Sequence, residues 1–294
     1  MEWSKAKSIL IMIFLALNLF LGYSLWEDFY MNFPSRVVSQ REIEEARAQL
    51  EFVNLELQAS ISRQIFSMSF LTVSNLEQQG ETLVASLFDS DQPFILEQGG
   101  EGTLQVYRQD KKQIYLWENG KVIFTQEPTG DGEEPMDEVL EESAAVSMAE
   151  EFLRNAHLFP VDARLEEVHP LGDRGYLIRY NQVYINHSLY GGYLLVQVTP
   201  QGVEQFELYW LEPQGFSGQE ISNISAAKAL ARLADNLEPF SKRAIVEAVN
   251  IGYYSEAFDA QKWDMVPVWR IRLSNGRTYY INAYTGELEG MEEM

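Results

Sequence analysis

One motif in the sequence has residue types and a spacing that could support nucleophilic catalysis. Ser225 and Lys228 form a Ser-x-x-Lys motif, in which a lysine amine can activate a serine hydroxyl for acyl transfer. The Ser-Asp-Asn and Lys-Thr-Gly motifs that accompany it in penicillin-binding enzymes are absent from the sequence. Ser225 also begins an alanine-rich amphipathic stretch, where a serine is expected to cap a helix. We therefore predict a helix cap at Ser225 and no catalytic residue.

The residues that most often bind transition metals are few and scattered. His157, His169 and His187 are the three histidines, and no two of them have ligand spacing within one predicted helix. The sequence has no cysteine, which excludes disulfides, thiolate metal ligands and a thiol nucleophile. Phosphate loops, dinucleotide fingerprints and metalloprotease motifs are also absent from the sequence. We predict no metal and no cofactor.

Two further groups of residues could bind a ligand, but each has a simpler explanation. Asp131, Glu133 and Glu134 offer oxygen ligands for Ca²⁺, although their spacing does not fit a helix–loop–helix calcium loop and an acidic linker explains them equally. Tyr253-Tyr254 and Tyr279-Tyr280 could form an aromatic platform, but half-buried strands select such residues in any case. We expect a structural role for both groups.

The N-terminal segment is predicted to cross a membrane. Residues 8–26 are almost uninterruptedly apolar and approach the roughly 20 residues that a spanning helix needs. Trp3 and Trp26 lie near the two ends of this run, and Lys5 and Lys7 precede it, which favours a cytoplasmic N-terminus. The run is longer than the apolar part of a secretory signal, and no small-residue cleavage site follows it. We predict an uncleaved anchor, with a cleaved signal and a buried core helix as the alternatives.

One face of the predicted anchor has the features of a contact between membrane helices. Asn18 is the only strongly polar side chain in the apolar run, and Gly22 follows four residues later on the same helix face. A glycine permits close approach of two backbones, and an asparagine in hydrocarbon gains from a hydrogen-bonding neighbour. The face formed by Phe14 or Leu15, Asn18 and Gly22 is therefore predicted to contact a partner helix.

Composition and charge exclude several classes of protein. The 294 residues are 46% hydrophobic and 13% aromatic, which excludes general disorder. The chain has 44 acidic and 22 basic residues, for a formal net charge of −22. A surface this acidic repels nucleic acids and anionic lipid headgroups, and it favours solubility outside the membrane.

The segment after the anchor is predicted to begin with a helix and continue with strands. Ser39 can cap a short helix over residues 39–50, whose first turns hold acidic side chains. Residues 65–73 and 82–88 are candidate strands in the following β-rich stretch.

Three hairpins share one predicted turn geometry. The first loop can contain Asn119-Gly120 alone or the three residues 118–120. The longer loop pairs Trp117 with Lys121 and places a purely apolar set on one face, so we favour it. Similar loops at residues 200–202 and 274–276 also group apolar side chains on one face. Each turn needs a residue with positive φ at its third position. These positions are occupied by Gly120, Gly202 and Gly276.

The spacing of these hairpins predicts an internal repeat. Helices over about 136–155 and 225–237, followed by strands over about 164–168 and 244–254, precede the second and third hairpins. We predict an α+β fold: an N-terminal transmembrane helix, then an extracytoplasmic region of repeats in which helices pack on antiparallel sheets. The residues Pro213–Glu220 are predicted to form a short second linker. The complete predicted division is a cytoplasmic tail 1–7, an anchor 8–26, a first outer region 27–126, an acidic linker 127–136, and a second outer region 137–294 made of repeats 137–215 and 216–294.

Two stretches resemble a known family. The opening MEWSKAK at residues 1–7, which leads directly into an anchor, resembles the start of the YycI family, also called WalI. The sequence VWRIRLSNGRTYYINAYTGE at residues 268–287 resembles the strand–turn–strand and Thr-Gly ending of PepSY-like envelope proteins. One anchor followed by about 260 outer residues also resembles the YycI and YycH architecture.

The resemblance implies a regulatory function. YycI proteins are accessory regulators of an essential sensor histidine kinase, of the WalK or YycG type, that controls cell-wall metabolism in Gram-positive bacteria. They act beside a YycH-type protein, through membrane helices and outer domains, and the family has no catalytic residue. The chain would then be a single-pass cell-membrane protein with most of its residues outside. The alternative is a PepSY-type envelope module that restrains a peptidase or binds a cell-wall component.

Overall fold

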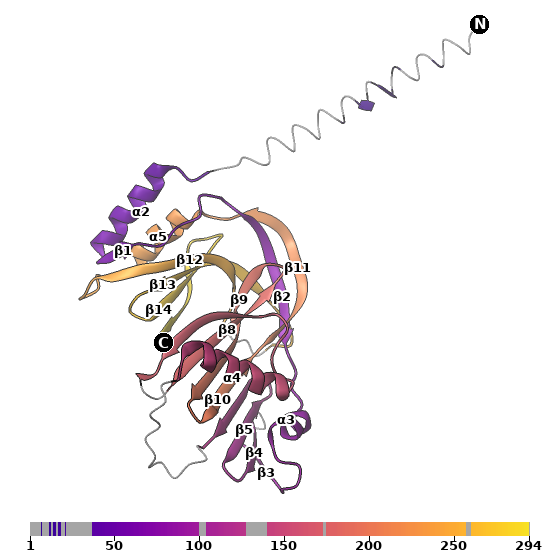
Figure 1. The fold of residues 1–294 in the computed structure, drawn as a ribbon. Coiled ribbons are helices and arrows are strands. Elements are labelled where there is room, and N and C mark those ends of the chain that lie inside the picture. The colour runs from indigo at the N-terminus through magenta and orange to yellow at the C-terminus, as the bar shows by residue number, and fades with distance from the viewer. Residues whose placement is uncertain are drawn as a thin grey trace.

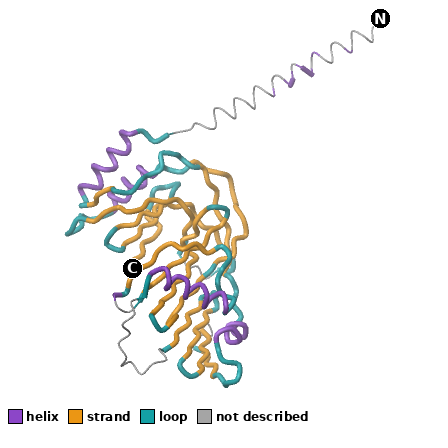
Figure 2. Tube along the Cα trace, viewed as in Figure 1, coloured by secondary structure: helices purple, strands orange, loops and turns teal. Residues whose placement is uncertain are grey.

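A computed structural model of the chain describes most of the region after the predicted anchor. The described residues are 37–99, 104–127, 140–172, 175–256 and 260–293, together with Lys7, Met12, Phe14, Leu15, Leu17, Asn18 and Leu21. They form a mixed fold that is dominated by β-sheet and contains a few helices (Figure 2). The helices are α2 (Gln40–Phe52), α3 (Gly80–Leu87), α4 (Glu142–Asn155) and α5 (Ala226–Asn236). The strands are β1 (Leu55–Leu57), β2 (Ser67–Asn75), β3 (Ile95–Gln98), β4 (Leu104–Gln109), β5 (Lys112–Trp117), β6 (Val122–Gln126), β7 (Ala163–Pro170), β8 (Tyr176–Tyr184), β9 (His187–Thr199), β10 (Gly202–Tyr209), β11 (Leu211–Ser222), β12 (Ala244–Tyr254), β13 (Trp263–Leu273), β14 (Arg277–Asn282) and β15 (Leu288–Glu293).

Helix α2 confirms the predicted first helix and its cap. The Ser39 side chain accepts a hydrogen bond from the backbone N–H of Glu42, and the Glu42 carboxylate accepts from the backbone N–H of Ser39 at 2.8 Å. This reciprocal pair satisfies two N–H groups that the helix itself leaves without partners. Ile43, Ala46 and Leu50 form the buried face of the helix, which packs against α5.

The prediction of a strand over residues 82–88 is wrong, because this segment forms helix α3. Leu83 and Leu87 are buried, whereas Ala85 between them is exposed. Burial at positions i and i+4 is the spacing of a helix face, and strand alternation would have buried Ala85 as well. A short apolar run does not by itself distinguish these two patterns.

The hairpin predictions are largely confirmed. In the first hairpin, Ile114 pairs with Phe124 and the backbone N–H of Trp117 donates to the carbonyl of Lys121, as the three-residue loop requires. In the third, Trp269 pairs with Ile281 and Ile271 with Tyr279, also in the predicted register.

The loop of the second hairpin is shorter than predicted. Thr199 pairs with Gly202, which leaves a two-residue loop, and a bulge between Val203 and Gln205 then restores the predicted pair Val196–Phe206. The Thr199 hydroxyl contributes to the shorter loop, since it accepts a hydrogen bond from the backbone N–H of Gln201 at 3.3 Å. The predicted apolar face therefore persists although the turn differs.

Each of the two repeated units consists of a helix and four consecutive antiparallel strands. Helix α4 is followed by β7–β8–β9–β10, and α5 is followed by β12–β13–β14–β15. The predicted pattern of one strand and one hairpin omitted β8 and β15. Helix α4 packs on β8, β9 and β10, and α5 packs on β13 and β14.

The two units join through a parallel pairing, so the prediction of purely antiparallel sheets is too narrow. Strand β12 pairs with β9 in parallel through Gly252–Ser188 and Tyr253–Leu189. The short strand β1 also pairs in parallel with β12. Figure 1 shows α2 and α5 at one end of the molecule and α3 with β3–β5 at the other.

Strands from the predicted first outer region complete both units. Strand β2 lies between β11 and β13, and β6 pairs with β10, so one sheet crosses the predicted linker at 127–136. Residues 128–139, which include Asp131, Glu133 and Glu134, lie outside the described residues. The predicted second linker, Pro213–Glu220, is instead part of strand β11. Its proline and glycines are tolerated because, among the described strands, β11 pairs only with β2 and forms an edge of the sheet.

Candidate interaction site

The predicted membrane face is described only in part. Phe14, Leu15 and Asn18 are helical and exposed, whereas Gly22, Trp3, Lys5 and Trp26 lie outside the described residues. The Asn18 side-chain amide donates a hydrogen bond to the carbonyl of Phe14 at 2.7 Å. No helix within the described part of the chain is long and apolar enough to span a membrane. The anchor and its contact face therefore stay predictions.

The first hairpin tip packs closely against the end of strand β2. Gly120 has φ of 78°, and the backbone N–H of Gly120 donates to the carbonyl of Trp117 at 2.9 Å. A Cβ at this position would lie 2.0 Å from the carbonyl oxygen of Leu76. Both the turn and this approach require glycine. Gly202 and Gly276 also have positive φ, at 130° and 85°.

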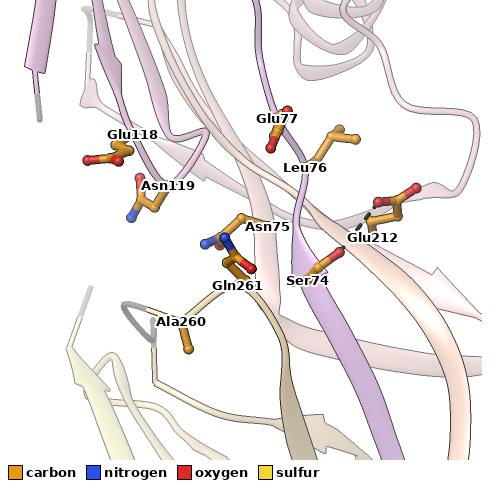
Figure 3. A pocket seen from close by; sticks show the side chains of 9 residues that line it. All are labelled: Ser74, Asn75, Leu76, Glu77, Glu118, Asn119, Glu212, Ala260 and Gln261. Atoms are coloured by element: carbon orange, nitrogen blue, oxygen red, sulfur yellow. Dashed lines mark hydrogen bonds between the residues drawn. The ribbon is translucent and has the colours of Figure 1, made fainter.

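An open polar groove of about 680 Å³ lies beside this hairpin tip (Figure 3). Segments that are distant in the sequence line it: the end of β2 and the residues after it, the β5–β6 turn, β11, and the loop before β13. The lining residues are Ser74, Asn75, Leu76, Glu77, Glu118, Asn119, Glu212, Ala260 and Gln261. A second groove of about 470 Å³ shares Glu77 and Glu118 with the first.

The chemistry of the groove is that of a recognition surface with acidic character. Its three carboxylates are Glu77, Glu118 and Glu212. Its hydroxyl, on Ser74, donates to Glu212 at 3.4 Å and accepts from the Gln214 amide at 3.1 Å. In the described residues, no group of His, Cys, Asp and Glu side chains is arranged to hold a metal ion. The groove can offer hydrogen-bond acceptors and negative charge to a polar or cationic partner.

A buried cluster of charges links the two repeated units. Arg270 and Arg272 of β13 form ion pairs with Glu166 and Glu167 of β7, and His169 lies 2.8 Å from the Glu167 carboxylate. The side chains of Arg270 and Glu167 are only 4% and 5% exposed. Burial would raise the pKa of Glu167, but hydrogen bonds from His169 and Arg272 and the two arginine charges lower the pKa below its ordinary value. The cluster fixes one unit against the other.

The tyrosines considered as a ligand platform belong to the interior. Tyr253, Tyr254, Tyr279 and Tyr280 are all at most 7% exposed. The rings of Tyr254 and Tyr280 stack with centroids 3.9 Å apart, and burial raises the pKa of Tyr280. These residues therefore stabilise the sheet.

Ser225, His157 and His187, the remaining candidates from the sequence, also belong to the structure of the fold. Ser225 caps α5 by accepting a hydrogen bond from the backbone N–H of Lys228 at 3.1 Å, which confirms the predicted cap. His157 has φ of 57° at the end of α4. The ring of His187 lies nearly perpendicular to the ring of Tyr253 and to that of Phe216, and burial lowers the pKa of His187.

A comparison with models of known protein families shows the family to which this chain belongs. The model of the YycI protein family matches residues 35–284. The chain belongs to the YycI family. Membership implies a role as a regulator of the Wal two-component system, and YycI proteins are accessory regulators. A comparison with curated proteins finds no match.

Solved structures add information about the fold. An uncharacterized protein from Eubacterium rectale is similar with a TM-score of 0.54 and 11% identity, over 85% of this YycI chain and 99% of the other. The C-terminal domain of Bacillus megaterium YpeB has a TM-score of 0.38 and 13% identity, over 74% of this chain and 98% of the other. The first likeness concerns the fold alone.

Sequence reasoning missed the groove and found only its hairpin tip. The groove residues come from segments that are brought together by the pairing of β2 with β11 and β13. The only part of the groove that the sequence indicated was the predicted turn at Asn119-Gly120. The position of that turn against Leu76 required the tertiary structure.

Proposed function

We propose that this chain is a membrane-anchored accessory protein without enzymatic activity that regulates a WalK-type sensor histidine kinase together with a YycH-type partner. The family match over residues 35–284 is the observation that carries this proposal. The kinase and the YycH-type protein are the partners that the family resemblance implies. The acidic groove and the exposed surfaces of the outer region offer places for protein contacts.

The proposed topology has the N-terminus in the cytoplasm and the outer region outside the cell membrane. Lys5 and Lys7 precede the apolar run, whereas Glu27 and Asp28 follow it. Lysines that flank a membrane helix favour the orientation in which they lie on the cytoplasmic side. This topology places residues 37–293 on the side where cell-wall signals arise, and the anchor beside the membrane helices of the kinase.

Asn18 and Gly22 are the proposed contact between the anchor and its partner helices. The side-chain amide of Asn18 has two donors and one acceptor, and the hydrogen bond to Phe14 uses one donor. The other donor and the side-chain oxygen can serve a neighbouring helix. Such contacts are worth about 0.6–2 kcal/mol in membranes.

The test replaces Asn18 and Gly22 with leucine, separately and together, in the full-length chain. Ala16→Leu is the matched control, because residue 16 lies about 160° from residue 18 around a helix. We expect the double variant to lose co-purification with the kinase and the YycH-type protein and to change kinase output, while the control keeps both. A phosphatase fused after Met294 checks that each variant keeps the outer topology.

Two results would contradict parts of the proposal. If the double variant associated and signalled like the wild type, the anchor would be a tether and the contacts would lie in the outer region. If deletion of the whole chain left kinase output unchanged, the regulatory function itself would be wrong.

A further inference from the structure

Among the strands that the structure describes, β3 forms the edge of the sheet with the least protection against pairing with another strand. Natural edge strands are protected by charges, prolines, bulges or short length. Strand β11 is protected by Pro213 and by two bulges in its pairing with β2, and β7 by Pro170 and by its part in the buried charge cluster. Strand β15 is protected by three glutamates, and β1 by its length of only three residues. Strand β3, at the other end of the strand order from β11, is short, with four residues, but it contains no proline, pairs with β4 without a bulge and carries a single charge, on Glu97.

The apolar side chains of β3 and of the residue before it are strongly exposed to solvent. Phe94, Ile95 and Leu96 are 46%, 63% and 48% exposed, and every residue of β3 is exposed. Its single charge, on Glu97, is paired with Arg108 of β4 at 3.1 Å. Successive side chains of a strand point to opposite faces, so apolar surface is exposed on both faces of this edge.

Hydrogen bonds determine which backbone groups of β3 point away from the sheet. The backbone N–H of Gly99 donates to the carbonyl of Leu104 at 2.8 Å. In an antiparallel pair the bonded residues alternate, so Glu97 and Ile95 also face β4. The N–H and C=O groups of Leu96 and Gln98 therefore point outward, at a spacing that a further strand can use.

Charge indicates what kind of strand fits this edge. Residues 76–112 contain seven acidic and three basic side chains, and the whole chain has a net charge of −22. This charge opposes pairing with a second copy of the chain and attracts a cationic segment. In such a strand the apolar side chains would cover Leu96 on one face, and the basic side chains would lie on the opposite face, which carries Glu97.

We propose that β3 is a docking edge to which a partner protein adds an extended strand that alternates apolar and basic residues. The added strand pairs with the outward backbone groups of Leu96 and Gln98, and its basic side chains lie on the face of the edge that carries Glu97. This inference rests on the proposed function, in which the outer region acts through another protein.

The test measures binding of a synthetic seven-residue peptide in which valine and lysine alternate, labelled with fluorescein, to the full-length chain in neutral detergent micelles. Two variants at one position separate the possible causes. Leu96→Pro removes an outward N–H and leaves the bonds to β4 intact, whereas Leu96→Thr keeps the N–H and removes the apolar side chain. We expect binding to weaken about tenfold or more for Leu96→Pro and only about twofold for Leu96→Thr.

Several outcomes would overturn the proposal. Equal binding by Leu96→Pro and the wild type would show that charge alone attracts the peptide. Equal losses for both variants would indicate apolar contact without strand pairing. Self-association of the wild type that Leu96→Pro abolishes would make a second copy the occupant.

A peptide variant keeps the test decisive if Leu96→Pro does not fold. N-methylation of the central valine removes a peptide N–H, so the wild-type chain should bind this peptide about tenfold more weakly. Unchanged binding would again overturn strand addition. These measurements use no kinase, so their failure is distinct from a failure of the proposed function, which kinase output after deletion of the chain reports.

Discussion

Replacement of Gly120 by alanine tests how the first hairpin is held against the rest of the sheet. Two costs combine at this position. A residue with a Cβ at φ of 78° costs about 1–2 kcal/mol relative to glycine. The new Cβ would also lie 2.0 Å from the Leu76 carbonyl oxygen, so the hairpin tip and the end of β2 must separate.

The second cost distinguishes Gly120 from an ordinary turn glycine. Forcing extra atoms into a packed site costs about 1–3 kcal/mol, so Gly120→Ala should destabilise the fold by about 2–5 kcal/mol in total. Gly172 is the matched control, because its φ is 64° and no atom of the described residues lies within 4 Å of a Cβ built there. Gly172→Ala should therefore cost only about 1–2 kcal/mol, which is the cost of the backbone conformation.

Urea unfolding of the full-length chain in detergent micelles, followed by circular dichroism, gives both values. The comparison requires equal slopes of the free energy of unfolding with urea concentration, since a changed slope reports a change in the folded or unfolded state. If Gly120→Ala and Gly172→Ala shifted the midpoint equally, the hairpin tip would not be packed on the Leu76 carbonyl. The described border of the groove would then be wrong.

Two further predictions concern the buried charge cluster. Arg270→Ala should lower the free energy of unfolding by about 3–5 kcal/mol, because it leaves a glutamate without its buried partner, whereas Arg41→Ala in an exposed pair should cost at most about 1 kcal/mol. Similar urea midpoints for these two variants would contradict the burial of the cluster. The pKa of Glu167 is lowered in the folded state, so its stabilising effect is present at neutral pH and is lost as the pH falls below the ordinary pKa of 4.5 and through the folded pKa. Glu167→Gln should therefore be less stable than the wild type at pH 7, and the difference in urea midpoint should shrink in acid; a difference that grew in acid would refute the assigned direction.

The sequence alone determined the features that depend on neighbouring residues. Ser39 and Ser225 could be identified as helix caps because the bonds that they make reach only three residues along the chain. The register of the first hairpin followed from side-chain alternation and from the glycine in its turn. The bounds of β12 were predicted at residues 244–254 because its apolar stretch is long and clearly delimited.

The tertiary structure decided what depends on distant partners. Helix α3 and strand β11 were misassigned, because a short apolar run fits two periodicities, and because proline and glycine are accepted in a strand once it lies at an edge. The pairing of Arg270 with Glu166, 104 residues away, has no local signal. Neither the groove nor the exposure of β3 could be read from the sequence, because both follow from the order in which strands pair. Strand order is set by the burial of whole faces across the sheet, and this energy depends on contacts that no short window of sequence contains.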